Sequence, residues 1–342
     1  MIYSADKEEL LSRAANVLSE GRLVAFPTET VYGLGADAKN LNAVSRIFAV
    51  KNRPKTHPLI VHVANLNKAK SISRDWPKTA EEFAKTFWPG PLTLVVKKND
   101  DVPDFVTGGQ DSVAIRIPAH SFALKLLKLF DERGSGLVAA PSANRFGGVS
   151  ATRYKDVEKS IGRFLHAEDL IIPSASSEFG LESTILDFTS EKPRILRLGA
   201  LGRKAINLKM NTRVVLDEKV VEMRKMSGSL KIHYSPVTPL FVLSRERIDK
   251  LLITQKQSLS AKIVYYGFTS LAFKSKFCEQ IIAPISSVEY ARTLYSLLFE
   301  LDDQGFNRMF FERPPETIEW EVIVDRLERA SSKYKGLNYE TF

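Results

Sequence analysis

The chain has 342 residues, of which 44% are hydrophobic and 26% are charged, and its formal net charge at pH 7 is +9. This composition is typical of a globular protein and excludes a disordered or collagen-like chain, while the length predicts two domains. The single cysteine, Cys278, excludes an internal disulfide framework and a cysteine-based metal site, and the sequence around it predicts an inert strand residue.

The first part of the chain has the alternating pattern of an α/β domain. Apolar residues recur at helical spacing from Leu10 to Leu18 and stop before Gly21, and a short apolar run follows at Leu23–Phe26. Helical stretches such as 122–130 separate further apolar runs at 59–63, 92–96, 113–117, 137–140 and 183–187. These runs predict the strands of a mixed, twisted sheet.

The sequence predicts a first domain at 1–205, an interdomain linker at 206–238 and a small α/β domain at 239–342. The linker is a mixed polar segment with turn-forming residues at 227–229 and at Pro236. Beyond it, FVLS, KIVYYG and MFFE are predicted strands, and 287–301 and 320–330 are predicted helices.

The excess positive charge belongs to the first two segments. Residues 1–205 carry 29 basic and 23 acidic side chains, 206–238 carry 6 and 3, and 239–342 carry 14 and 14. We therefore expect an anionic substrate or a nucleic acid to meet the N-terminal part. The sequence has no apolar run of about 18 residues and no secretion-signal pattern at its start, so we expect a cytoplasmic protein with no membrane partner.

The stretch FPTETVYGLGADA raises the question of a dinucleotide site, because residues 33–38 satisfy the pattern G-x-G-x-x-A. Six residues separate the predicted strand from Gly33, whereas a dinucleotide-binding glycine belongs in the turn directly after the strand. The acidic residue required about 20 positions further on is also missing, since Lys55, Thr56 and His57 stand there. The dinucleotide interpretation is therefore disfavoured.

Polar residues gather beside the predicted strands of the first domain, where open α/β folds place their ligands. Lys51 and Arg53 flank a turn set by Pro54, so both cations can face one phosphate chain. Arg116, within the predicted strand VAIRIP, is costly to bury without an anion, although a surface-facing position is an alternative. The local pattern around His62 favours an ordinary core histidine.

Several catalytic classes are excluded by the absence of their motifs. The sequence has no P-loop, no H-E-x-x-H, no G-x-S-x-G and no kinase signature. The five histidines are scattered without ligand spacing, so no metal site made by protein side chains alone is expected.

Six blocks in this order, FPTETVYGLGADA, KNRPKTHPLIVHV, FWPGPLTLVV, VAIRIP, APSANRFGGVSAT and ESTILDF, resemble the YrdC-like family. With KIHYSP in the linker and the second α/β domain, the chain is similar to the long, two-domain threonylcarbamoyl-AMP synthases. The resemblance implies a YrdC-like twisted mixed sheet whose helices help to form a basic concave site, and a smaller Rossmann-like domain.

The resemblance also implies a reaction, in which a nucleotidyltransferase makes threonylcarbamoyl-AMP and pyrophosphate from L-threonine, bicarbonate and ATP with Mg²⁺. The product would serve the N6-threonylcarbamoyladenosine modification of tRNA, with tRNA or a downstream threonylcarbamoyl-transferase complex as partner. A non-catalytic RNA-binding module is the alternative, although no aromatic RNA-binding motif is present.

The resemblance further implies roles for individual residues. The predicted L-threonine contacts are Thr30, His62, Arg116 and Ser183. The predicted ATP contacts are Lys51, Arg53, His57, Pro141, Ser142, Asn144, Arg197 and Tyr234. Lys51, Arg53, Ser142 and Asn144 are expected to be catalytic through positioning and charge, without a covalent nucleophile. ATP would hold the Mg²⁺, and the linker would act as an active-site lid carrying Tyr234.

Overall fold

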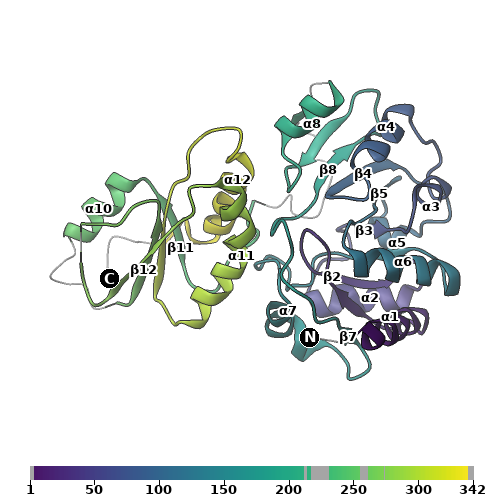
Figure 1. Ribbon diagram of the computed structural model, residues 1–342, viewed down its shortest axis with the longest axis horizontal. Helices are drawn as coiled ribbons and strands as arrows, with labels where there is room; N and C mark the ends of the chain where they lie inside the picture. The colour runs from purple at the N-terminus through teal and green to yellow at the C-terminus, as the bar shows by residue number, and fades with distance from the viewer. Residues whose placement is uncertain (1–3, 212–213, 217–230, 255–260, 273, 338–342) are drawn as a thin grey trace. The chain divides into compact units, whose positions relative to one another are not determined.

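The computed structural model describes residues 4–211, 214–216, 231–254, 261–272 and 274–337, and the chain divides into two compact units (Figure 1). Unit 1 comprises residues 1–146 and 150–229, and unit 2 comprises 147–149 and 230–342. The predicted linker contains most of α8 (Arg203–Met210) and all of β10 (Val215–Leu216). Its predicted turn at 227–229 lies outside the described residues.

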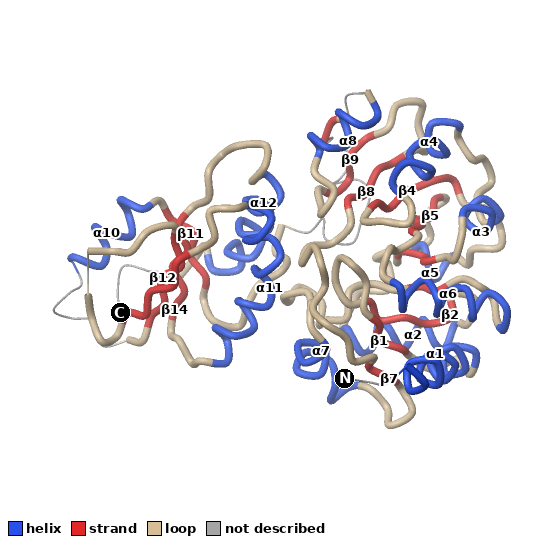
Figure 2. The backbone as a smooth tube through the Cα atoms, viewed as in Figure 1, coloured by secondary structure: helices blue, strands red, loops and turns tan. Residues whose placement is uncertain are grey.

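Unit 1 is a mixed sheet surrounded by helices (Figure 2). Besides β10, its strands are β1 (Val24–Phe26), β2 (Gly33–Asp37), β3 (Ile60–His62), β4 (Leu92–Lys97), β5 (Ser112–Arg116), β6 (Val138–Ala139), β7 (Leu170–Ile171), β8 (Thr184–Asp187) and β9 (Arg194–Arg197). Besides α8, its helices are α1 (Ser4–Ser19), α2 (Leu41–Lys51), α3 (Leu66–Ser71), α4 (Lys78–Phe87), α5 (Asp104–Thr107), α6 (Ser121–Arg133) and α7 (Tyr154–Ile161), followed by the 3-10 turn η1 (Gly162–Phe164).

The strand order among the described residues is β10-β9-β8-β4-β5-β3-β6-β2-β1-β7. The sheet contains parallel pairs, such as β3 with β5 and β4 with β8, and antiparallel pairs, such as β4 with β5 and β1 with β2. The predicted mixed α/β sheet is confirmed. Each apolar run named above coincides with a strand, because a strand that is buried on both faces of a sheet is predominantly apolar.

Gly33–Asp37 forms β2 between β1 and β6, a strand that the apolar runs of the sequence did not predict. A Cβ on Gly35 would lie 2.8 Å from the ring of Phe26 and 3.0 Å from a methyl group of Val138. This glycine therefore permits close packing inside the sheet. The strand conformation of Gly33 and Gly35 also confirms that the stretch is not a dinucleotide-binding turn.

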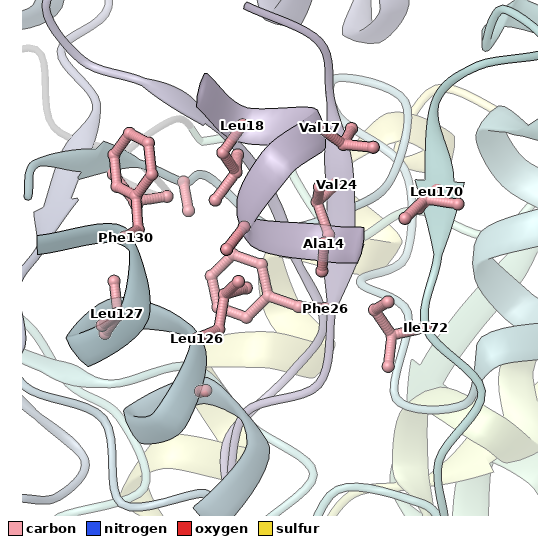
Figure 3. Close-up of a cluster of buried hydrophobic side chains, with 14 of the residues drawn as sticks. Ala14, Val17, Leu18, Val24, Phe26, Leu126, Leu127, Phe130, Leu170 and Ile172 are labelled. Carbon is pink, nitrogen blue, oxygen red and sulfur yellow. The ribbon is translucent and has the colours of Figure 1, made fainter. Parts of the chain in front are cut away.

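One hydrophobic core cluster of unit 1 lies between α1, α6 and the strands β1 and β7. Figure 3 shows Leu18 of α1, Leu126 and Phe130 of α6, and Phe26 of β1 directed toward one another. Apolar residues at helical spacing give α1 and α6 one buried face each, and together these faces cover this end of the sheet.

Unit 2 has a parallel sheet of order β11-β14-β12-β13. Its elements are β11 (Leu240–Leu243), α10 (Arg245–Thr254), β12 (Ile263–Gly267), β13 (Cys278–Ile282), α11 (Ser287–Asp303), β14 (Arg308–Glu312), α12 (Glu321–Ser331) and the 3-10 turn η2 (Ser332–Tyr334). Figure 2 shows α10 on one side of this sheet and α11 and α12 on the other. The predicted small α/β domain is confirmed. Cys278 begins β13, and burial raises the pKa of its thiol to about 11.

We predict that Leu126→Ala lowers the free energy of unfolding of unit 1 by about 2–5 kcal/mol, because it leaves a cavity between α1 and α6. Chemical denaturation measures this loss. Lys128→Ala, which changes an exposed position on the same helix, is the matched control and should alter stability little. Equal effects of the two substitutions would contradict the packing assignment.

Candidate active site

A cavity opens in unit 1, where the segment before β2 meets several strand ends; the space not filled by atoms, including open solvent at its mouth, is about 400 Å³. It is lined by Thr28, Thr30, Val31, Tyr32, Gly33, Ile60, His62, Arg116, Ala140, Pro141, Ser142, Glu182, Ser183 and Arg197. The structure thus brings together every predicted threonine contact, and also Pro141, Ser142 and Arg197 from the predicted ATP contacts.

The sheet register explains how two of these side chains meet. His62 ends β3 and Arg116 ends β5, and these two residues are paired in the parallel register of the two strands. Paired residues on neighbouring strands point to the same face. An imidazole and a guanidinium are therefore placed side by side at one edge of the cavity.

Arg116 is buried and held in a defined orientation. Its Nη2 donates to Oε1 of Glu29 at 2.6 Å, its Nη1 donates to Oγ1 of Thr30 at 2.9 Å, and its Nε donates to the carbonyl of Gly90 at 3.2 Å. The carboxylate of Glu29 offsets the cost of burying the guanidinium, and the three hydrogen bonds fix the plane of the guanidinium. Within the described part of the chain, these three acceptors leave two of the five N–H groups of Arg116, which suits an incoming carboxylate.

Thr30 presents an acceptor to the cavity. Thr28 Oγ1 donates its single proton to the carbonyl of Val31 at 2.6 Å, so the hydroxyl of Thr30, 2.8 Å away, must donate to Thr28. Thr30 Oγ1 also accepts from Arg116, and one of its lone pairs remains. The sequence TET therefore forms a compact hydroxyl network around the arginine.

His62 is buried and also lines the cavity. It therefore has the core position that the local sequence pattern favoured, and it also lies at the site that the resemblance implied. Burial and the nearby charge of Arg116 lower its pKa to about 3. Its ring meets that of Phe26 edge-on, with the centroids 6.3 Å apart. The imidazole is neutral at physiological pH and can hydrogen-bond a ligand without adding charge.

Ser183 and Arg197 form another corner of the cavity. Arg197 Nη2 donates to the carbonyl of Ser183 at 2.8 Å and to its hydroxyl at 3.2 Å, and that hydroxyl lies 2.7 Å from Oγ1 of Thr93. A Cβ on Gly199 would lie 2.3 Å from the carbonyl oxygen of Glu182. The glycine therefore allows the turn after β9 to pack against the chain at Glu182, which places Arg197 beside Ser183.

Lys51 and Arg53 belong to a cluster of cations buried in unit 1. Helix α2 ends at Lys51, and Asn52 adopts a left-handed conformation with φ 52°, so the chain reverses between the two cations. Burial and the charges of Arg53 and Arg145 lower the pKa of Lys51, and burial and Arg197 lower the pKa of Arg53 to about 10. A buried group of like charges indicates a site for an anion.

The loop after β6 is fastened to this cluster. Lys51 Nζ donates to the carbonyls of Ser142 and Asn144 at 2.5 Å each, and the Asn144 side chain donates to the carbonyl of Arg145 at 2.8 Å. The rings of His57 and Phe146 meet edge-on at 5.3 Å. Lys51, Arg53, His57 and Asn144 do not line the cavity of Thr30 and Arg116, and their predicted contacts with ATP stay predictions.

Tyr234 lies in unit 2. It is 1% exposed and has φ 61°, and its ring stacks on Tyr295 at a centroid distance of 5.7 Å. The guanidinium carbon of Arg326 lies 4.8 Å from the same ring. Tyr234 is therefore a packing residue of unit 2 here, and its predicted contact with ATP stays a prediction.

Sequence reasoning did not select Glu29 and Glu182. Glu29 completes the Arg116 network, and Glu182 lines the cavity with Oε1 accepting from Ser150 Oγ at 2.6 Å. The signal available was their place directly beside Thr30 and Ser183, because a carboxylate beside a predicted buried site is costly without a role there. No group of three or more His, Cys, Asp or Glu within the described residues could hold a metal ion.

Two family models match the chain. One, described as "Telomere recombination", matches residues 16–199, and one described as "Threonylcarbamoyl-AMP synthase, C-terminal domain" matches residues 201–332. A threonylcarbamoyl-AMP synthase from Pyrococcus abyssi is 36% identical over 328 residues, which are 93% of each chain. One from Bacillus subtilis is 33% identical and covers 94% of this chain and 92% of its own.

A solved structure is similar over the same length. The crystal structure of Pyrococcus abyssi Sua5 complexed with L-threonine has a TM-score of 0.84 and is 36% identical, and the match covers 95% of both chains. The fold of both units is therefore shared with that protein. In the described part of this chain, no helix has the length and apolar character needed to cross a membrane.

We predict that the imidazole of His62 stays neutral as the pH falls from 8 to 4, because its folded pKa is about 3. The unfolded chain takes up a proton near pH 6.5, so His62 lowers the stability of the fold progressively as the pH falls through 6.5 toward 3. NMR titration of the ring checks this, with the exposed His166 as the internal reference. Protonation of His62 near pH 6 would contradict the assignment.

Proposed function

Because the chain belongs to the family of long, two-domain threonylcarbamoyl-AMP synthases, we propose that it condenses L-threonine, bicarbonate and ATP to threonylcarbamoyl-AMP and pyrophosphate. The observation that carries the proposal is the pairing of two features in unit 1. A cavity containing the oriented Arg116 and Thr30 suits an amino acid, and the buried cations at Lys51 and Arg53 suit a polyphosphate.

In the proposed complex, the amino acid occupies the cavity. Its carboxylate meets the remaining N–H groups of Arg116, and its hydroxyl reaches the Thr30 network. His62 contributes a neutral hydrogen-bonding group. Ser183, whose hydroxyl is fixed by Thr93, completes the threonine contacts.

The proposed chemistry requires anions to approach one another. The threonine amine loses a proton and takes up the carboxyl group of bicarbonate, and an oxygen of the resulting carbamate attacks the α-phosphorus as pyrophosphate leaves. The carbamate and the phosphates repel one another, and Lys51, Arg53 and Arg197 offset that repulsion. Catalysis then depends on an in-line geometry and on fixed positive charge.

The residues present fit Mg²⁺ as an ion that arrives bound to ATP. The predicted triphosphate site is cationic, so it would repel a bare divalent ion and accept one already neutralised by phosphate oxygens. Mg²⁺ would supply charge neutralisation at the leaving pyrophosphate. Ser142 and Asn144, held through their carbonyls by Lys51, would position the phosphates beside it.

We assign the product to tRNA modification in the cytoplasm, with tRNA or a threonylcarbamoyl-transferase complex receiving it. The alternative of a non-catalytic RNA-binding module is less favoured, because Lys51, Arg53 and Arg197 are buried. A module that binds RNA through its phosphates needs its cations at the surface.

Purified protein given ATP, L-threonine and bicarbonate should release pyrophosphate and form threonylcarbamoyl-AMP, and omission of either threonine or bicarbonate should abolish both products. Serine should be the main competitor and valine nearly inert, because a site that hydrogen-bonds a hydroxyl rejects an analogue lacking it, whereas a lost methyl costs only about 1–3 kcal/mol. Equal turnover of valine and threonine would contradict the proposed contacts.

We predict that Arg53→Ala lowers kcat/KM for ATP by about 30-fold, which corresponds to about 2 kcal/mol for a lost charge-assisted phosphate contact. Lys55→Ala removes an exposed cation two residues away and is the matched control. Steady-state kinetics with threonine and bicarbonate held constant measure both variants. A folded Arg53→Ala protein with unchanged kcat/KM would remove Arg53 from the site.

A further inference from the structure

An amino acid reaches the cavity with its amine protonated, because the pKa of an α-amino group lies above neutral pH. An ammonium group has no lone pair and is unable to attack carbon, so the proposed reaction needs a proton acceptor close to the amine. The titratable side chains that line the cavity are Tyr32 between β1 and β2, His62 on β3, Arg116 on β5, Glu182 before β8, and Arg197 on β9.

Four of these five groups are poor acceptors. Arg116 and Arg197 are cations. His62 has a pKa of about 3, so it binds a proton more weakly than an ordinary carboxylate, and as a neutral ring it does not attract an ammonium group. Tyr32 would have to ionise first, but burial raises the pKa of its hydroxyl, which donates to the carbonyl of Ile172 at 3.0 Å. Glu182 is the one remaining titratable group among the described residues that line the cavity.

Glu182 is held through both its side chain and its backbone. Its Oε1 accepts a hydrogen bond from the buried hydroxyl of Ser150 at 2.6 Å. Its backbone carbonyl accepts a hydrogen bond from the amide of Ala200 at 2.8 Å. Ala200 belongs to the turn after β9, which can pack against Glu182 because Gly199 has no side chain. Glu182 as a residue is only 5% exposed, and it still borders the cavity. Such restraint is what a proton acceptor of fixed position requires.

The charges around the cavity match a zwitterion that acquires a further negative charge. Arg116 provides a cation for the amino-acid carboxylate, and Glu182 provides an anion for the ammonium group. Arg197, whose guanidinium binds the carbonyl of the adjacent Ser183, provides a second cation. If a carbamate formed on the amine, Arg197 would stabilise its new negative charge.

We infer that Glu182 is the general base of the carboxylation step, an inference that rests on the proposed function. A carboxylate oxygen of Glu182 takes one proton from the ammonium group of threonine. The freed lone pair attacks the carbon of bicarbonate, so that the C–N bond forms and the C–OH bond breaks. The departing hydroxide leaves as water with the second amine proton, and the products are the carbamate and water. Glu182 then releases its proton to solvent.

The test compares wild type, Glu182→Gln and Glu178→Gln by their kcat/KM for threonine between pH 7 and pH 8.5, at saturating ATP and constant bicarbonate. Glutamine keeps the shape of the side chain but accepts no proton. Glu178 is exposed, four residues earlier in the chain, and serves as the matched control. Melting temperature and ATP affinity are measured for every variant.

Glu182→Gln should reduce kcat/KM by about 100-fold or more at pH 7, the range of a lost general base. Its residual rate should rise with pH, by up to about tenfold per pH unit below the pKa of the amine, because only the neutral amine in solution can then react. Wild type and Glu178→Gln should show no such rise. A merely structural role would lower the rate of Glu182→Gln by the same factor at every pH, and this result would overturn the inference.

Glu182→Asp decides the question if the glutamine variant does not fold. Aspartate keeps a carboxylate, so this variant should be slower than wild type yet retain its shallow pH dependence, and a tenfold rise per pH unit would overturn the inference. Failure of the proposed function looks different, because wild type would then form no threonylcarbamoyl-AMP at any pH.

Discussion

The burial of positive charge inside unit 1 is the constraint on which the rest of the site depends. Arg116 is offset by Glu29, whereas Lys51 and Arg53 have their pKa values lowered by burial and by neighbouring cations. A fold retains such groups at a cost in stability, because a buried charge loses its hydration. In the proposed complex, an anionic ligand would offset that cost by pairing with the buried cations.

The sheet supplies the geometry that makes this arrangement possible. The order β8-β4-β5-β3-β6-β2 brings strand ends separated by about 150 residues of sequence to one cavity. His62 and Arg116 meet because β3 and β5 pair in parallel register. Thr28 Oγ1 donates to the carbonyl of Val31 and Thr30 Oγ1 accepts from Arg116, so the orientation of the arginine is set before any ligand arrives.

Most of the fold follows from patterns that are local in the sequence. Short apolar runs bounded by turn residues predicted β1, β3, β4, β5 and β8, and helical spacing predicted α1 and α6. β2 was not predicted from these patterns, because two of its residues are glycines and its conformation depends on pairing with β1 and β6. β9, in RILRLG, was also missed, because charged residues interrupt its apolar pattern. The predicted contacts of Tyr234 and of the linker remain predictions.

The sequence by itself determined the α/β class, the cationic character of the first domain and the identity of the family, because composition, periodicity and ordered motifs are properties of the chain. The assignment of Thr30, Arg116 and Ser183 to threonine likewise came from motifs in the chain. Only the tertiary structure decided that Glu29 lies against Arg116 and that Glu182 borders the same cavity. A side chain's partner across the sheet depends on strand register and order, and neither is encoded within one local segment.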